Sequence, residues 1–232
     1  MMKIRRSHDR GHARHGWLES FHSFSFAGYY DPRHMGFRRL RVINQDLIAP
    51  SSGFPTHPHR DMEIISYLVE GQLAHRDSMG HTEVITRGEV QYMSAGTGVA
   101  HSEYNPSLDE RAHLLQIWIE PQQLGLKPRY AQRSFLKEFE GGGLVQVLSP
   151  DGAAGSLEIH QDARLHIAWP KEKSSIMLPL KKDRHGWLQV VRGEIAIGDQ
   201  VLGPGDAAAI SGEENPVLEA SAQSEFLFFD LA

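Results

Sequence analysis

Four residues of the types that bind transition metals occur in two pairs. His57 and His59 lie two positions apart in THPHRDMEII, and His101 and Glu103 lie two positions apart in GTGVAHSEYNP. Alternate side chains of a β-strand project from one face, so each pair can direct its donor atoms toward one ion. Imidazole and carboxylate suit iron, manganese, zinc, copper or nickel. The pairs therefore predict one metal site that retains one or two open coordination positions.

Composition restricts what else could hold an ion. The chain of 232 residues contains no cysteine, which excludes disulfides, thiolate zinc sites, iron–sulfur clusters and cysteine nucleophiles. It contains 14 histidines. Any bound metal must therefore be held by histidine, aspartate or glutamate.

Charge and hydropathy bear on partners and location. The formal net charge of −5 provides no net positive field, which argues against sequence-independent binding to nucleic acid or anionic membranes. No segment approaches the roughly 18–20 apolar residues that cross a bilayer, and the basic N-terminal segment lacks the apolar run of a secretion signal. We therefore expect a cytoplasmic protein without direct nucleic-acid or membrane partners.

Short β-strands are the elements expected to position these residues. Helical periodicity is scarce, with a turn or two expected within ARHGWLESF and PRYAQRSFLKEF. The pattern of short apolar runs predicts an all-β fold. These runs, bounded by Gly, Pro, Asp or Ser, are FSFAGYY, RRLRVINQDLI, EIISYLVEG, GEVQYMSAG, HLLQIWI, WLQVVRGEIAIG and FLFFDL.

Two parts of the chain resemble each other. SYLVEGQLAH around Gly71 is followed by TRGEVQYMSAG around Gly88, and LQVVRGEIAI around Gly193 is followed by VLGPGDAAAISG around Gly205. In each part an apolar strand reaches a glycine that can supply the positive φ of a hairpin turn. The repeat predicts two stacked β-barrels.

The joint between the barrels is expected near residues 121–155, which are rich in Pro and Gly. We predict an N-terminal metal-binding barrel over residues 1–130. The C-terminal barrel, residues 131–232, is expected to lack metal ligands because no His-x-His occurs there.

The two metal-ligand pairs stand within longer motifs that resemble those of the cupin superfamily. The matching residues are Gly53, His57, His59, Glu63 and Gly71 in the first motif, and Gly88, Gly96, His101 and Asn105 in the second. Departures from the usual spacing point to one branch, the pirin family. The N-terminal half resembles pirin sequences in RGHARHGWLESFHSFSFAGYYDP, MGFRRLRVINQD, GFPTHPHRDMEIISYLVEG, HRDSMG, SAGTGVAHSEYNPS and LLQIWIEP.

The resemblance implies a fold, a cofactor and a ligand set. A pirin is a bicupin of two jelly-roll barrels with one mononuclear metal, usually iron, in the N-terminal barrel. The implied ligands are His57, His59, His101 and Glu103. Iron is therefore the expected divalent ion, and zinc, manganese, copper, nickel and cobalt are the alternatives.

Asp61 and Glu63 continue the alternation that begins at His57. Along an extended strand at about 3.3 Å per residue, Glu63 lies roughly 20 Å from His57 and about 13 Å from His59. Unless the strand bends sharply, Glu63 cannot reach an ion held by the two histidines, and the same reasoning weakens Asp61. We expect both to be hydrogen-bonding neighbours of the ligands or solvated charges.

The resemblance also implies an activity. Bacterial pirins look like quercetin 2,3-dioxygenases, which open the central ring of a flavonol with O2. The expected partners are thus a planar aromatic substrate and O2. Glu103 is assigned both coordination of the ion and the role of catalytic base. Phe24 and Phe26 are expected to stack on the flat substrate.

A second hypothesis is a non-catalytic regulator. Pirins in other organisms are implicated as partners of transcription factors or metabolic enzymes, with iron as a redox-sensitive switch. Arg38, Arg39 and Arg41 could meet an acidic protein partner, or form a solvated strand edge. A cupin isomerase or sugar-binding module would share the fold but not the pirin-like segments.

The remaining histidines are expected to be structural. For His12, His15, His22 and His34, orienting contacts or surface positions are favoured over a second metal site. His75 is expected to be exposed beside a turn. Two further patterns concern faces: His22, Phe24 and Phe26 share one face, whereas His113 and Gln116 lie on opposite faces of their strand.

Overall fold

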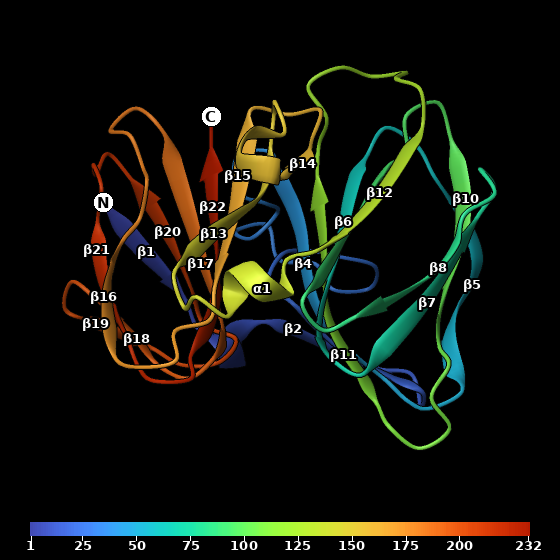
Figure 1. Cartoon of the computed structure of the whole chain (residues 1–232), viewed down its shortest axis with the longest axis horizontal. Helices are drawn as coiled ribbons and strands as arrows, with labels where there is room; N and C mark the ends of the chain where they lie inside the picture. The colour runs from blue at the N-terminus through green and yellow to red at the C-terminus, as the bar shows by residue number, and fades with distance from the viewer. The chain divides into compact units, whose positions relative to one another are not determined.

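The computed structural model describes all residues from 1 to 232, and most of the chain is β-strand (Figure 1). The helical elements are α1 Leu136–Phe139 and two 3-10 helices, η1 Ser7–Asp9 and η2 Ala153–Gly155. The predicted all-β class is confirmed. None of the helices has the length and apolar character needed to cross a membrane.

The chain forms two compact units. One comprises residues 11–134, and the other comprises residues 1–10 together with residues 135–232. The predicted division into residues 1–130 and 131–232 differs from this one in two places. The first ten residues belong to the other unit, and the first unit ends at residue 134. The first ten residues belong with the C-terminal half, because the strand within them pairs with a strand near the C-terminus.

The unit of residues 11–134 contains two antiparallel sheets. The seven-stranded sheet has the order β12-β9-β6-β11-β4-β3-β2, and the four-stranded sheet has the order β5-β10-β7-β8. The strands are β2 Gly11–Arg14, β3 Leu18–His22, β4 Leu40–Ile48, β5 Ser52–His59, β6 Glu63–Glu70, β7 Gln72–Asp77, β8 Thr82–Thr86, β9 Glu89–Ser94, β10 Val99–Asn105, β11 Ala112–Ile119 and β12 Arg129–Ser134.

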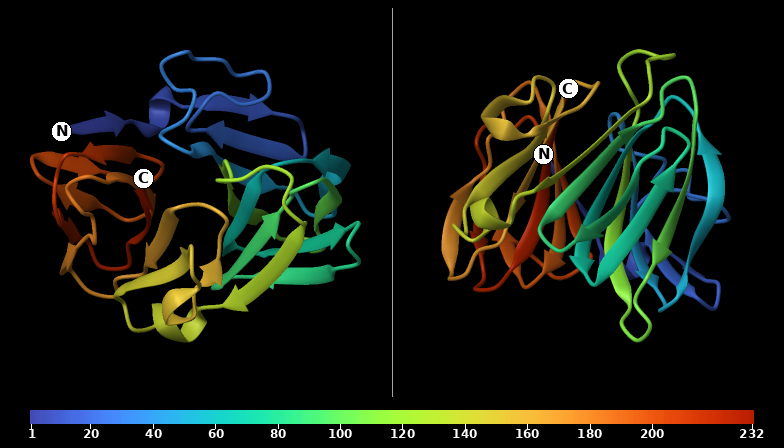
Figure 2. Two further views of the ribbon diagram at one scale, coloured as in Figure 1. Left: turned by 90° about the horizontal axis from the view of Figure 1, so that it is seen from above. Right: turned by 45° about the vertical axis from the view of Figure 1, so that its right-hand side comes forward.

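The other unit repeats this arrangement. Its seven-stranded sheet has the order β1-β20-β17-β22-β15-β13-β14, and its four-stranded sheet has the order β16-β21-β18-β19. The orange and red strands of this unit lie together in Figure 2. The strands are β1 Met2–Arg5, β13 Leu144–Ser149, β14 Leu157–Glu158, β15 Ala163–Ala168, β16 Ser174–Met177, β17 His185–Arg192, β18 Ile195–Ile197, β19 Gln200–Leu202, β20 Ala207–Ser211, β21 Val217–Ala220 and β22 Glu225–Leu231.

The matching strand orders confirm the internal repeat. The core run β9-β6-β11-β4 corresponds to β20-β17-β22-β15, and β5-β10-β7-β8 corresponds to β16-β21-β18-β19. Gly71 and Gly193, with φ values of 75° and 70°, make the equivalent turns that follow β6 and β17. Only glycine adopts such angles without strain, so the repeated glycines fix equivalent hairpins.

One predicted strand and one predicted helix are wrong. FSFAGYY forms no strand, only an isolated bridge between Phe26 and Tyr29, and the hydroxyl of Ser25 holds a turn by bonding to the backbone of Asp31. ARHGWLESF contributes to β2 and β3, because pairing with β4 overrides its weak helical pattern. PRYAQRSFLKEF holds β12 and the single turn α1.

The interiors of the two units differ in polarity. Fourteen buried apolar side chains, including Leu188, Ile210 and Phe228, form one cluster in the unit that ends at Ala232. In the unit of residues 11–134, the cluster around Leu68 and Leu114 fills only part of the interior, and a layer of buried polar side chains fills the rest. Buried polar groups require partners, so this layer is where a site is expected.

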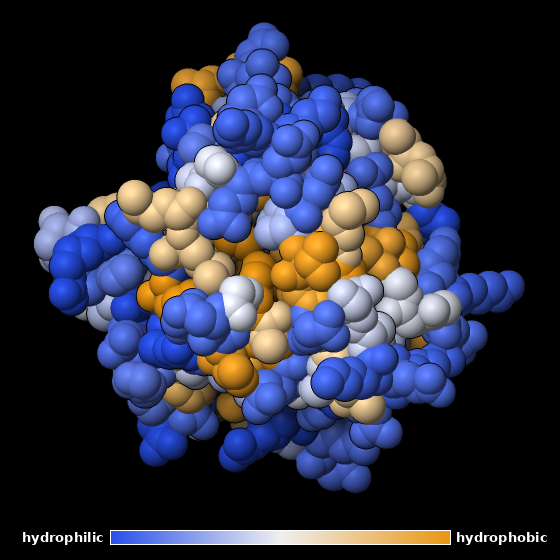
Figure 3. Space-filling view, turned by 90° about the vertical axis from the view of Figure 1, so that its left-hand side faces the viewer, coloured by the Kyte–Doolittle hydropathy of each residue, from blue (hydrophilic) through white to orange (hydrophobic).

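Exposed apolar side chains gather on one face of the molecule, ringed by polar residues (Figure 3). Three of the large exposed ones, Met177, Val201 and Val217, lie on β16, β19 and β21 of the smaller C-terminal sheet.

Gly53 permits a close approach between β5 and β10. A Cβ at this position would collide with the carbonyl oxygen of Glu103 and lie 2.6 Å from Cα of Tyr104. We expect Gly53→Ala to lower the free energy of unfolding by about 1–3 kcal/mol, because the strands must move apart. Urea unfolding measures the change. Gly28→Ala is the matched control, since no atom lies within 4 Å of its added Cβ, and equal midpoints for the two variants would contradict the prediction.

Candidate metal centre

Three histidines meet where β5 and β10 pair. His57 lies directly opposite His101, and His59 lies opposite Val99. The ring centroids of His57, His59 and His101 are 4.5, 4.8 and 4.9 Å apart. One nitrogen from each ring lies within 4.8 Å of the other two, so the group can hold a metal ion.

Glu103 lies beside this group, on the inner side of β10. The register between β5 and β10 shifts after His101, so that Glu103 lies opposite Phe54. The carboxylate of Glu103 forms a second group with His101 and His75, again with donor atoms within 4.8 Å of one another. His101 is common to both groups, and the predicted residues are therefore brought together in one region of the barrel.

Two polar side chains hold the carboxylate of Glu103. The amide of Gln116 donates to both oxygens, at 3.0 and 2.8 Å, and the hydroxyl of Ser66 donates to Oε1 at 3.1 Å. Glu103 is 2% exposed. A buried carboxylate that accepts several hydrogen bonds keeps a fixed orientation.

Burial keeps the imidazoles of His59 and His101 neutral. Burial lowers the pKa of His101 to about 3, and the neighbouring His57 and His75 add to this effect. Burial, together with His101 and His57, lowers the pKa of His59 to about 4. Neutral imidazole is the form that binds metal, because a protonated ring has no free lone pair.

A buried nitrogen of His101 bears on whether this group of residues can bind a metal ion. Nε2 of His101 is buried and has no hydrogen-bond partner. Such a group is unfavourable unless something else binds it. Three imidazoles and an adjacent carboxylate form a donor set typical of first-row transition metals. The residues present therefore fit a metal ion.

The prediction that His75 is exposed beside a turn is wrong. It is 1% exposed, and its ring centroid lies 5.3 Å from that of His101. Its Nε2 bonds to Asp77 at 3.2 Å, and its Nδ1 accepts from Gln91 at 3.2 Å. The turn expected beside His75 begins only after Asp77, so His75 remains within β7 and points into the barrel.

Asp61 and Glu63 lie outside both groups. The chain turns between β5 and β6, with Asp61 at a φ of 49°, so the assumption of one straight strand is wrong. Asp61 accepts a hydrogen bond from the backbone of Gly125 at 2.7 Å. Glu63 is 1% exposed and bonds to the hydroxyls of Tyr92 and Ser94, which makes it a buried structural carboxylate rather than a solvated charge.

Aromatic side chains cover one side of the histidine group. The indole of Trp118 packs edge-on against His59 at 4.9 Å and against Phe26 at 5.4 Å. Sequence reasoning did not single out Trp118, although its place two residues after Gln116 on β11 puts both on one face. Phe24 is 2% exposed and belongs to the core, whereas Phe26 is only partly buried.

The N-terminal histidines have separate partners. His12 stacks on Phe21 at 4.5 Å and bonds to Glu19 at 3.0 Å. His22 is buried and bonds to Asn44 at 2.8 Å. The predicted orienting contacts are present for both residues.

The opposite faces predicted for the β11 polar residues are confirmed. Gln116 points inward to Glu103, whereas His113 bonds to Gln45 at 3.0 Å and remains partly exposed. This alternation selects which of the two polar side chains supports the site.

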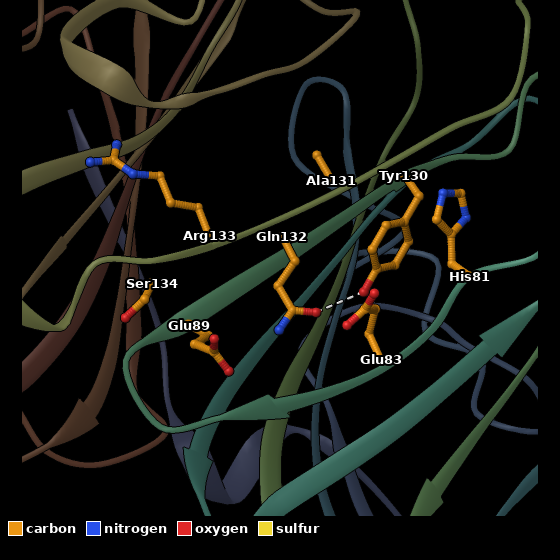
Figure 4. A pocket seen from close by; sticks show the side chains of 8 residues that line it. All are labelled: His81, Glu83, Glu89, Tyr130, Ala131, Gln132, Arg133 and Ser134. Carbon is orange, nitrogen blue, oxygen red and sulfur yellow. Dashed lines mark hydrogen bonds between the residues drawn. The ribbon is translucent and has the colours of Figure 1, made fainter.

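A hollow of about 420 Å³ opens at the seam between β8 and β12 (Figure 4). Tyr130 and His81 lie side by side there, with ring centroids 4.6 Å apart, and the hydroxyl of Tyr130 donates to Gln132 at 2.7 Å. Glu83 and Glu89 also line the hollow. On its inner side, Tyr130 contacts His75 at 5.0 Å, so a single aromatic ring separates the hollow from the buried histidines.

The fold and site define a two-barrel protein of the cupin type, and comparisons with known proteins agree. A family model described as "Pirin" matches residues 3–119, and one described as "Quercetinase C-terminal cupin domain" matches residues 146–231. The chain belongs to the pirin family.

Relatives and solved structures cover the whole chain. It is 50% identical to a quercetin 2,3-dioxygenase of Escherichia coli K12 over 100% of this chain and 99% of the relative. It is 40% identical to a pirin-like protein of Caulobacter vibrioides over 96% of each. The structure resembles bacterial pirin YhhW from Escherichia coli in complex with nickel(II), with a TM-score of 0.94 and 48% identity over 100% of this chain and 99% of that one.

The buried carboxyl of Asp46 on β4 makes the free energy of unfolding depend on pH. Burial raises its pKa from 3.8 to about 7, the hydroxyl of Ser20 opposes this, and the charge of Glu103 adds to it. The folded state therefore binds the proton more tightly than the unfolded state does. Stability is highest below pH 3.8 as far as this group is concerned, and falls as the pH rises through about 7.

Asp46→Asn should remove this pH dependence. Between pH 4 and 8 the wild type should lose free energy of unfolding on the order of 4 kcal/mol at most, from about three pKa units, and the variant should lose less. Urea unfolding at several pH values measures both. Asp109→Asn, at an exposed position, is the control. Parallel pH profiles for the wild type and Asp46→Asn would rule out the role of this carboxyl.

Proposed function

We propose that this protein is a metal-dependent dioxygenase that opens a flavonol such as quercetin with O2. The observation that carries the proposal is the convergence of three imidazoles, one with a buried and unpaired nitrogen, beside a hydrogen-bonded carboxylate. The name of the Escherichia coli relative supports the same activity at 50% identity over the full chain.

His57, His59, His101 and Glu103 are the proposed ligands of one ion. When bound, the metal supplies Lewis acidity, which lowers the pKa of a hydroxyl held at an open coordination position. Iron is the proposed ion. The nickel complex of the related YhhW agrees with a donor set that accepts several divalent metals.

Glu103 is also the proposed base. Its carboxylate would take the proton from the 3-hydroxyl of the flavonol and return it later in the reaction. The two hydrogen bonds from Gln116 and one from Ser66 fix the orientation of this carboxylate. Burial at 2% exposure keeps water from competing for that position.

The aromatic substrate is proposed to lie against Phe26 and Trp118. These rings contact each other, and Trp118 contacts His59, so together they form an apolar wall beside the proposed ligands. Partly buried Met62 and Met79 pack in the same cluster as Trp118. Phe24 is too deeply buried to contact a ligand, so the substrate-stacking role expected for it passes to Phe26 and Trp118.

The regulatory alternative receives less support from the arginine segment. Arg39 pairs with Glu120 at 3.0 Å, and Arg41 donates to the backbone oxygens of Ser25 and Met35. Two of the three arginines thus serve contacts within their own unit.

His101→Ala should abolish metal binding and flavonol turnover while leaving the fold intact. The reason is that His101 is common to both groups of potential ligands. Metal analysis, circular dichroism and the loss of flavonol absorbance measure the three properties. His12→Ala is the control, because His12 lies outside both groups. An active His101→Ala enzyme would refute the proposed centre, and metal without turnover in the wild type would favour the regulatory alternative.

Glu103→Gln separates the base from the ligand. We expect kcat to fall by about 10²–10⁴-fold, the usual contribution of a general base, in a protein that still binds metal. The measurement is turnover per bound metal ion. Full activity per ion in this variant would eliminate the base role.

A further inference from the structure

Asp77 is the centre of a buried hydrogen-bonded array behind the histidine group. Its Oδ1 accepts from the backbone amides of Met79 and His81, at 2.9 and 3.1 Å. Its Oδ2 bonds to Nε2 of His75 at 3.2 Å and to Nδ1 of His81 at 2.9 Å. The side chain of Asp77 is fully buried. A carboxylate has no hydrogen to donate, so Asp77 is the acceptor in its hydrogen bonds with both imidazoles and both amides.

The array fixes which nitrogen of His75 carries the proton. Because Asp77 accepts, Nε2 of His75 must be the donor, and in the neutral ring Nδ1 is then an acceptor. The amide of Gln91 faces this Nδ1 at 3.2 Å, in agreement with an acceptor there. The donor of His75 therefore points toward Asp77, and its lone pair points the opposite way.

His101 lies at the end of this chain of donors and acceptors. Its Nδ1 is 3.5 Å from Nδ1 of His75. The single lone pair on Nδ1 of His75 accepts from Gln91 at 3.2 Å, so His101 is the second and more distant donor to the same nitrogen. Two acceptors that face each other repel, and this arrangement therefore favours the form of His101 whose Nδ1 carries the hydrogen. Nε2 of His101 then has the free lone pair, and this is the buried nitrogen without a hydrogen-bond partner.

We infer that His75 and Asp77 are positioning residues that hold His101 in its metal-binding tautomer. The inference rests on the proposed function, in which His101 is a ligand. Strand pairing supports it, since His101 lies directly opposite Asp77 and Glu103 lies directly opposite His75 in the β10–β7 register. The pairing of β10 with β7 thus places Asp77 and His75 beside His101 and Glu103, the two residues that β10 contributes to the proposed site.

Tyr130 and His81 close the array on its outer side. The ring of Tyr130 lies against that of His81, with centroids 4.6 Å apart (Figure 4). It also lies 5.0 Å from the ring of His75, so it contacts both imidazoles that bond to Asp77. The side chain of His81 is 39% exposed, whereas those of His75 and Asp77 are fully buried. Water therefore does not compete for the hydrogen bond between His75 and Asp77.

Three variants separate positioning from simple packing. Asp77→Asn presents an amide donor to His75 and can reverse its tautomer. His75→Leu removes the acceptor that faces His101. His75→Gln restores the pattern, because its amide can donate to Asp77 while its carbonyl oxygen accepts from His101. His166→Leu is the matched control, since His166 is also a buried histidine but lies on β15 of the other unit.

Metal affinity is the first readout. Competition between each purified protein and a chelator for Ni²⁺ gives the dissociation constant without reference to turnover. We expect it to rise about 10–100-fold in Asp77→Asn and His75→Leu, the usual effect of removing a partner of a metal-binding histidine. His75→Gln and His166→Leu should stay close to the wild type. Circular dichroism verifies that each variant is folded.

The tautomer itself is the second readout. Nitrogen-15 NMR of the histidine rings in the metal-free protein should give the Nδ1–H form for His101 in the wild type and in His75→Gln. The Nε2–H form should increase in Asp77→Asn. This readout distinguishes the two failures, because loss of the proposed metal centre would leave the tautomers unchanged.

An Nε2–H form of His101 in the metal-free wild type would overturn the inference. So would Ni²⁺ affinity in His75→Leu equal to that of the wild type, or an equal loss of affinity in His75→Gln and His75→Leu, which would indicate packing alone.

Discussion

The antiparallel pairing of β10 with its two neighbours is the constraint on which the site depends. On one side it places His57 opposite His101, and on the other it places Asp77 opposite His101 and His75 opposite Glu103. The strand β10 therefore has the two proposed histidine ligands of β5 on one side and the buried His75 and Asp77 of β7 on the other. Alternation along β10 places Glu103 on the same buried face as His101, and Gly53 allows the backbones of β5 and β10 to approach beside it.

The two barrels share a topology but have different interiors. In the C-terminal unit apolar side chains such as Leu188 and Phe228 fill the space, and burial of each contributes about 1.5–3 kcal/mol. In the unit of residues 11–134, Ser66, Gln116 and Glu103 replace such side chains and bond to one another. A polar layer of this kind stabilises little by itself, because hydrogen bonds only replace those made with water. It does fix the orientation of the carboxylate of Glu103.

Local alternation made the proposed ligands visible in the sequence. His57 and His59, like His101 and Glu103, are two positions apart, and strands form where apolar runs end at Gly71 and Gly193. The supporting residues carry no such local signal. His75 stands two positions before Asp77 in HRDSMG, but only the pairing of β7 with β10 reveals that both face inward. Trp118 stands in the apolar run HLLQIWI, where the sequence indicates only a core residue, and its contact with His59 is known only from the structure.

The sequence by itself determined the all-β class, the internal repeat and the two pairs of proposed ligands, because these depend on residues close together in the chain. The tertiary structure decided where Met2–Arg5 belongs, since its partner β20 lies some two hundred residues away. It also decided the hydrogen-bond partners of Glu63, which are Tyr92 and Ser94 because the chain turns at Asp61. Contacts between strands distant in sequence depend on register and burial, and no local pattern encodes them.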